Sequence, residues 1–195
     1  MAQPCQLYLK VAISRPNLEA FLQSEAGSAA CFDDFEHWLD ANRRWRGDMT
    51  WRELCELGQG TTAQAWIDGW SRHLRSPARN HYDETTGIWT LAVLEFAESR
   101  EWVIGALNVL RRIADFTDPP GVGHLLIYEY LFEQGSVVAA VELVPGQSRI
   151  LLGELPENLT VEADRVMGGL LRAMDVSGTY AVQRKTDTGA DKEAD

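Results

Sequence analysis

The sequence predicts an α+β domain in which helices pack on a mostly antiparallel sheet. Two observations predict this class. Short segments with alternating apolar residues, typical of half-buried strands, occur near the start of the chain and through its second half. Segments with helical apolar spacing lie between them, and a Trp-rich stretch at about 31–76 is helical throughout. With 195 residues and 45% hydrophobic content, the chain can form one core, so we expect a single domain over 1–176.

The first half begins with a strand and a helix. "QLYLKVAIS" places Leu7, Leu9 and Val11 on one side of a strand, and Pro16 suits the first turn of a helix that runs to about Glu25. Three helices are expected in the Trp-rich insertion. The first follows residue 31, the second begins at a capping box in "TWRELCEL", and the third, "TTAQAWIDGWSRHL", places Trp66, Trp70 and Leu74 at i, i+4 and i+8.

The second half predicts a sheet with two helices. "HYDETTGIWTLAVLEF" indicates two strands joined by a turn at Gly87, and "SRILLGEL" a later strand. The segment after Ser99 is expected to be a helix with Trp102 on its apolar face. The closing helix is expected to turn these residues inward: Val161, Val166, Leu170, Leu171 and Met174. Residues 177–195 lack periodicity and predict a disordered tail.

A hairpin is expected within "DPPGVGHLLIYEYLFEQGSVVAAVEL", residues 118–143. Its glycines follow a helix and precede a strand, whereas a phosphate-binding loop needs the opposite order, so a helix stop and a tight turn are predicted. A two-residue turn at 134–135 would pair Leu126 with Leu143. We interpret His124 as a histidine at the edge of the core rather than a catalytic base.

In this register Glu129 and Glu142 are diagonal neighbours on one face, and Glu95 of the preceding strand could join them. Three interpretations stay open: a solvated face, a surface for cationic groups of a partner, and a divalent-metal or acid/base site. No HxH, HExxH, DxD or GxSxG motif accompanies the acids, so we predict no catalytic residue, metal ligand or cofactor. The candidate partner-binding residues are Glu129, Glu133, Glu142, Glu95, Asp118, Asp83 and Glu84.

Charge narrows the choice of partner. The net charge is −11, and residues 80–180 hold fifteen acidic against six basic residues. Nucleic acid and anionic membranes are therefore unfavourable partners, and a basic protein is a favourable one. Arginines interleave with Trp45 and Trp51, but nearby acids can pair with them, so cation–π contacts in a Trp-packed core are expected. Three cysteines without a CxxC pair indicate neither disulfides nor zinc, and with no apolar leader or span we expect a cytoplasmic protein.

The segments "YDETTGIWTLAVLEFAES", "VLRRIADF" and "GHLLIYEYLFEQGSVVAAVEL" resemble immunity proteins of bacterial polymorphic toxin systems over roughly residues 80–145. The resemblance implies a small acidic α+β protein that occludes a toxin and catalyses no reaction; it assigns no role to any residue. We therefore predict a non-enzymatic protein that binds a cognate toxin or effector through an acidic surface around the hairpin. Two alternatives remain: an adaptor or chaperone for a secreted effector, and a metal-dependent enzyme using Glu95, Glu129 and Glu142.

Overall fold

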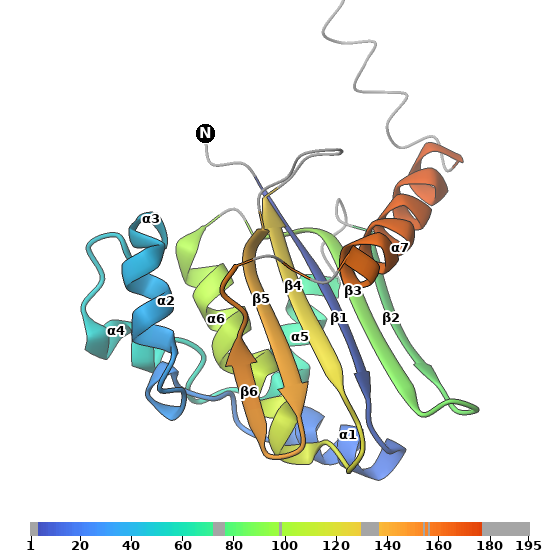
Figure 1. Ribbon diagram of the computed structural model, residues 1–195, viewed down its shortest axis with the longest axis horizontal. Helices are drawn as coiled ribbons and strands as arrows, with labels where there is room; N and C mark the ends of the chain where they lie inside the picture. Colours follow the sequence, from blue (N-terminus) through green and yellow to red (C-terminus); the bar gives the residue numbers. More distant parts are fainter. Residues whose placement is uncertain are drawn as a thin grey trace, which may run out of the picture.

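A six-stranded antiparallel sheet organises the molecule (Figure 1). The computed structural model describes residues 4–71, 77–97, 99–129, 137–153, 155 and 157–176. The strand order is β2-β3-β1-β4-β5-β6, so the first strand of the chain lies inside the sheet. The strands are β1 (Cys5–Ala12), β2 (Ala78–Asp83), β3 (Ile88–Ala97), β4 (Gly123–Glu129), β5 (Val137–Val144) and β6 (Gln147–Ile150).

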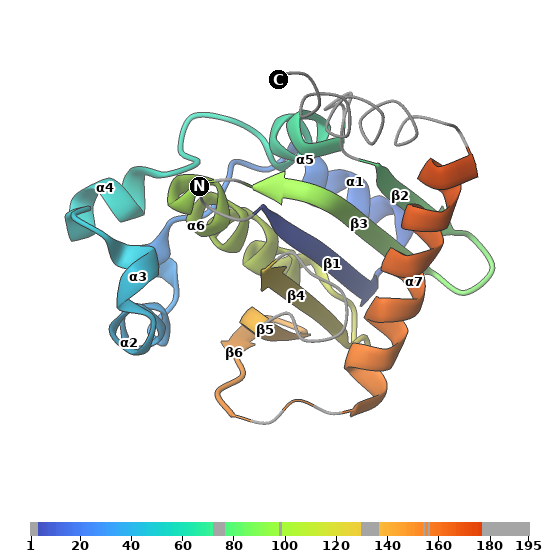
Figure 2. The ribbon, with the colours of Figure 1, turned by 90° about the horizontal axis from the view of Figure 1, so that it is seen from above.

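Helices lie on both faces of the sheet (Figure 2). Helix α7 crosses one face, α1, α5 and α6 lie on the other, and α2, α3 and α4 extend beyond α6. The α-helices are α1 (Arg15–Gln23), α2 (Phe35–Ala41), α3 (Arg43–Arg46), α4 (Trp51–Glu56), α5 (Ala63–Ser71), α6 (Arg100–Leu110) and α7 (Glu157–Val176). Two 3-10 helices, η1 (Ala29–Cys31) and η2 (Arg111–Phe116), complete the described elements, and the class is α+β as expected.

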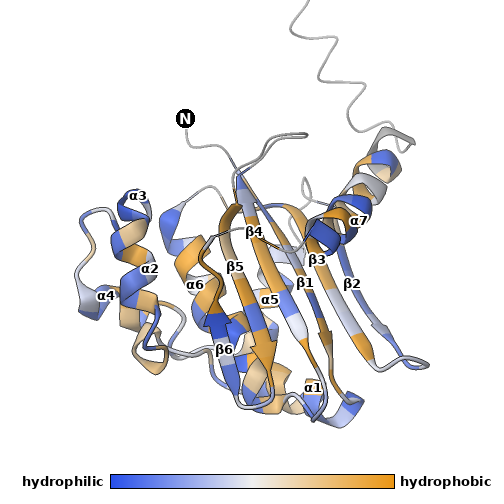
Figure 3. Cartoon of the chain, in the orientation of Figure 1, coloured by the Kyte–Doolittle hydropathy of each residue, from blue (hydrophilic) through white to orange (hydrophobic). Residues whose placement is uncertain are grey.

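The sheet separates two buried apolar clusters, and Figure 3 shows hydrophobic residues along the strands and α6. Odd-numbered residues such as Leu9 and Leu125 face the larger cluster, formed with α1, α5, α6 and η2. Even-numbered residues such as Tyr8 and Leu126 face the smaller cluster, formed with α7. Because side chains alternate along a strand, this assignment determines the face of every other strand residue away from bulges.

Several local predictions are confirmed. Leu7, Leu9 and Val11 are fully buried on one side of β1, and Pro16 lies in the first turn of α1. The capping box at the start of α4 is present, with the Thr50 side chain accepting from the Glu53 N–H and the Glu53 carboxylate accepting from the Thr50 N–H. A helix stop and a loop precede β4, as the Pro- and Gly-rich stretch predicts.

Other predictions are wrong. The described part of the insertion, to residue 71, contains four α-helices rather than three, because Arg43–Arg46 forms a separate turn that ends at Gly47 with φ 54°. Trp102 is 43% exposed and meets Trp66 edge-on instead of entering the core. In α7, Val166, Leu170 and Leu171 pack against the smaller cluster as predicted, but Val161 is 59% exposed, and the buried positions are Leu159, Ala163 and Met167. Leu74, the Met174 side chain and the predicted disordered tail at 177–195 lie outside the described residues.

A buried ion pair joins the insertion to the sheet. Arg111 is 1% exposed, and its guanidinium donates to the Asp34 carboxylate at 2.6 Å and to Ser148 of β6. The same carboxylate accepts the Ile150 backbone N–H at 2.6 Å, and the guanidinium stacks on the Phe32 ring. Burial lowers the pKa of Arg111, and the hydrogen bond that Arg111 donates to Asp34 opposes that shift. The contact therefore holds the start of α2 against the β6 edge.

Candidate functional site

The predicted acidic pair does not form. The hairpin register places Leu126 opposite Ala140 rather than Leu143, and His124 opposite Glu142. Since directly opposed residues share a face, Glu142 lies on the α7 face, whereas Glu129 continues the odd-numbered, oppositely facing set of β4. The two carboxylates also sit five positions apart along β4, about 16 Å at the usual rise per residue. A divalent ion cannot bridge Glu129 and Glu142 in this arrangement.

The apolar faces explain the register. In the observed pairing, odd-numbered residues of both strands, such as Leu125 and the directly opposed Val141, face the larger cluster. The predicted two-residue turn would have paired even residues of β4 with odd residues of β5. It would therefore have placed the odd-numbered side chains of β5 on the opposite face of the sheet from the odd-numbered side chains of β4. Glu133 and the rest of the connection, 130–136, lie outside the described residues.

Glu129 lies at the end of β4, where it meets the helical insertion. Its carboxylate is 2.8 Å from a guanidinium nitrogen of Arg44 in α3, whose guanidinium also lies 5.5 Å from the centre of the Trp45 ring. This contact confirms the expected pairing of an insertion arginine with an aromatic ring. Glu95 is partly buried near the end of β3. It lies at the same end of the sheet as Glu129, because Cys5 of β1 pairs with Glu129 on one side and with Ala97 of β3 on the other.

Three of the predicted acids meet at the opposite end of the sheet. Asp118 accepts the Ser14 N–H at 3.4 Å and the Asn17 amide at 2.7 Å. Glu84 forms an ion pair with Arg15, next to these residues. Asp83 accepts the N–H groups of Thr85 and Thr86, and hydrogen bonds from Thr86 and Thr85 hold its pKa below the usual range. Asp83 and Asp118 thus accept hydrogen bonds from uncharged donors, and these bonds do not neutralise the two carboxylates.

A polar row crosses the α7 face of the sheet. Directly opposed residues, one from each strand, line up in the order His81, Thr90, Lys10, His124, Glu142 and Arg149. Arg149 donates to Glu142 at 3.0 Å, and Lys10 donates to Glu162 of α7 at 2.6 Å. Directly opposed side chains have Cβ atoms about 4.5–5.5 Å apart, so each member can contact the next. Sequence reasoning missed the row because its members are far apart in the chain.

A cavity of about 300 Å³ opens where this row passes beneath the first turns of α7. Its polar lining is Lys10, His124, Asn158 and Glu162, and its apolar lining is Ala12, Ile88, Val122 and Leu159. Burial is the main cause that lowers the pKa of His124, with Glu142 and Glu162 opposing and Lys10 reinforcing the shift. Burial therefore favours the neutral imidazole. The prediction that His124 stands at the edge of a core agrees with its half-buried position.

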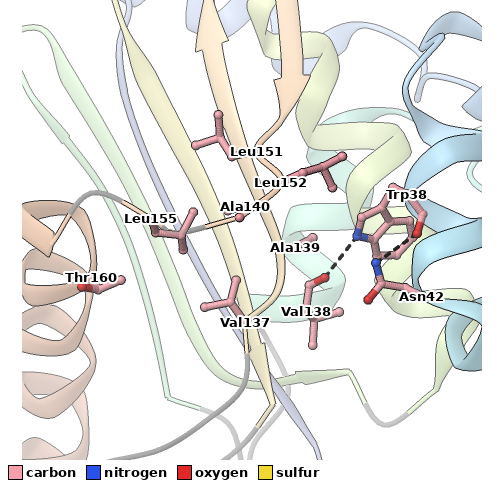
Figure 4. A pocket seen from close by; sticks show the side chains of 11 residues that line it. Trp38, Asn42, Val137, Val138, Ala139, Ala140, Leu151, Leu152, Leu155 and Thr160 are labelled. Atoms are coloured by element: carbon pink, nitrogen blue, oxygen red, sulfur yellow. Dashed lines mark hydrogen bonds between the residues drawn. The ribbon is translucent and has the colours of Figure 1, made fainter.

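A second hollow, a groove of about 530 Å³, follows the open half of β5 (Figure 4). Strand β6 pairs only with Val141–Val144, so in the described chain Val137–Ala140 have β4 on one side and no strand on the other. The Trp38 indole N–H donates to the Val138 carbonyl at 3.1 Å and protects this edge. Val137, Ala140, Leu151, Leu152 and Leu155 form the apolar lining, with Asn42 and Thr160 at either side. Leu152 is 58% exposed and Val137 37% exposed.

Among the residues that the structure describes, no group of three or more His, Cys, Asp or Glu side chains is placed to hold a metal ion. No helix in the described chain is long and apolar enough to cross a bilayer. Comparison with protein-family models, with curated proteins and with solved structures gave no match to this chain.

Proposed function

We propose that this chain is an immunity protein that binds a toxin or effector with a basic surface and neutralises it without a reaction of its own. The groove along β5 carries the proposal. It belongs to the hairpin for which the sequence predicts docking, and Val137 and Leu152 expose apolar surface around it. An apolar hollow next to exposed large apolar side chains is typical of protein interaction sites, because docking removes that surface from water.

Charge supports a basic partner. The chain carries −11 overall, and most of the excess belongs to residues 80–180, which form most of the sheet. A negative field accelerates association with a basic protein and adds specificity. Asp83 and Asp118 would contribute to this steering, while Glu129 and Glu142 already bind Arg44 and Arg149 and would exchange or share those contacts.

The test begins with the native partner. We would capture it from the source cell with the tagged full-length chain, express it alone to see whether it stops growth, and then coexpress this chain. The proposal expects a toxic partner and restored growth. A partner that is harmless alone would overturn the immunity function in favour of the adaptor or chaperone alternative.

A matched pair of variants tests the groove. Leu152→Asp introduces a charge into the groove lining, and Val161→Asp introduces the same charge at an equally exposed apolar position on α7 that the groove does not include. Leu152→Asp should raise the Kd for the partner at least tenfold and abolish protection, whereas Val161→Asp should behave like the wild type. Equal affinities for both variants would exclude the groove from the interface.

A further inference from the structure

The cavity under α7 offers hydrogen-bonding capacity that the chain itself does not use. Lys10 has three N–H groups, and Glu162 takes one of them. The His124 ring and the Asn158 amide line the same cavity, and neither has a hydrogen-bond partner within the described residues. At least three polar groups from β1, β4 and α7 are therefore directed to one small space.

The cavity lining has one cationic and one anionic side chain. Lys10 is bound to Glu162 of α7 at 2.6 Å, so these two charges sum to zero. A simple anion would meet the Glu162 carboxylate, and a simple cation would meet Lys10 and the positive end of α7. A molecule with both charges matches the pattern.

The remaining lining is apolar, and the cavity volume limits the size of the ligand. Ile88, Val122 and Leu159 line the cavity together with the polar groups. Its volume of about 300 Å³ lies at the lower end of the range for small-molecule sites, roughly 300–1,000 Å³. An α-amino acid with a short aliphatic side chain has the required size and both charges.

We propose that this cavity binds a free aliphatic α-amino acid, with its carboxylate on Lys10 and Asn158 and its ammonium on Glu162 and the His124 ring. The side chain would pack on Ile88, Val122 and Leu159. A neutral imidazole can accept a hydrogen bond from the ammonium. This site has other lining residues than the β5 groove, so the proposal of amino-acid binding does not depend on toxin binding.

Calorimetric titration of the full chain tests the site with three probes that differ by one group. L-leucine carries both charges, 4-methylpentanoate lacks the ammonium, and 3-methylbutylamine lacks the carboxylate. Leucine should bind at least tenfold more tightly than either analogue. No heat with leucine up to 10 mM, or an analogue that binds as tightly as leucine, would overturn the assignment.

Variants then locate the binding. Lys10→Met and Asn158→Ala should each raise the Kd for leucine at least fivefold. Asn158 is exposed, so its variant is expected to stay folded, as circular dichroism would show. Arg52→Met is the control, because the Arg52 side chain is 86% exposed on α4 and does not line the cavity. Unchanged affinity in both cavity variants would place any leucine binding elsewhere and refute the proposal.

Discussion

At the scale of single residues, one buried charge has a large effect on stability. Asp34→Ala would leave the fully buried Arg111 guanidinium without its carboxylate partner and free the Ile150 N–H. Loss of one partner of a buried ion pair typically costs about 3–5 kcal/mol, because the other charge stays desolvated. We expect the free energy of unfolding in urea to fall by about that amount.

The control for this prediction is Asp40→Ala. Asp40 lies 3.5 Å from Arg46, but its side chain is 62% exposed, and exposed pairs contribute about 0–1 kcal/mol. Both variants remove an aspartate from the same part of the insertion. If their urea midpoints coincide, the Asp34–Arg111 contact is not what holds α2 against β6.

Single residues also show where sequence reasoning stops. Lys10, Thr90, His124 and Glu142 each interrupt a strand that is otherwise rich in apolar residues. That interruption is the one clue to the polar row in the printed sequence. It becomes informative only when the register of all strands is known, because one residue of error moves a side chain to the opposite face.

At the scale of elements, α7 covers its face of the sheet through Leu159, Ala163 and Met167. Ala163 is 0% exposed beneath the helix, so Ala163→Leu would add three carbon atoms at a fully buried position between α7 and the sheet. Overpacking of this kind costs about 1–3 kcal/mol. Val161→Leu, at a position 59% exposed on the same helix, should change stability by less than about 0.5 kcal/mol. Equal urea midpoints for the two variants would mean that α7 does not pack as described.

Periodicity predicted most elements but not their pairing. The alternation in β1 and β3 and the helical spacing in α5 and α6 depend on neighbours in the chain, which a sequence displays directly. The β4–β5 register depends on which apolar residues meet across strands, and several alignments of two aliphatic strands satisfy that condition. The predicted Glu129–Glu142 pair failed for this reason, while the convergence of Asp83, Glu84 and Asp118 required the whole topology.

At the scale of the whole molecule, charge controls association. The net charge is −11 at pH 7, and the sequence pI is about 4.8. Near that pH the repulsion between copies disappears, so self-association should be greatest there. Light scattering should rise at pH 4.8 relative to pH 7.5, with circular dichroism confirming that the chain is still folded. A flat scattering profile across this range would contradict the prediction.

The polar row has a consequence for folding fidelity. If β5 slipped by one residue against β4, Glu142 would turn toward the aliphatic interior under α6 and η2, where a bare carboxylate is costly. A slip of β1 would send Lys10 into the same interior. Lys10 on β1 and Glu142 on β5 therefore each oppose a slip of their own strand, because the slip would bury their charge. The polar row therefore disfavours misaligned strand pairings while the sheet folds, and this effect does not depend on any ligand.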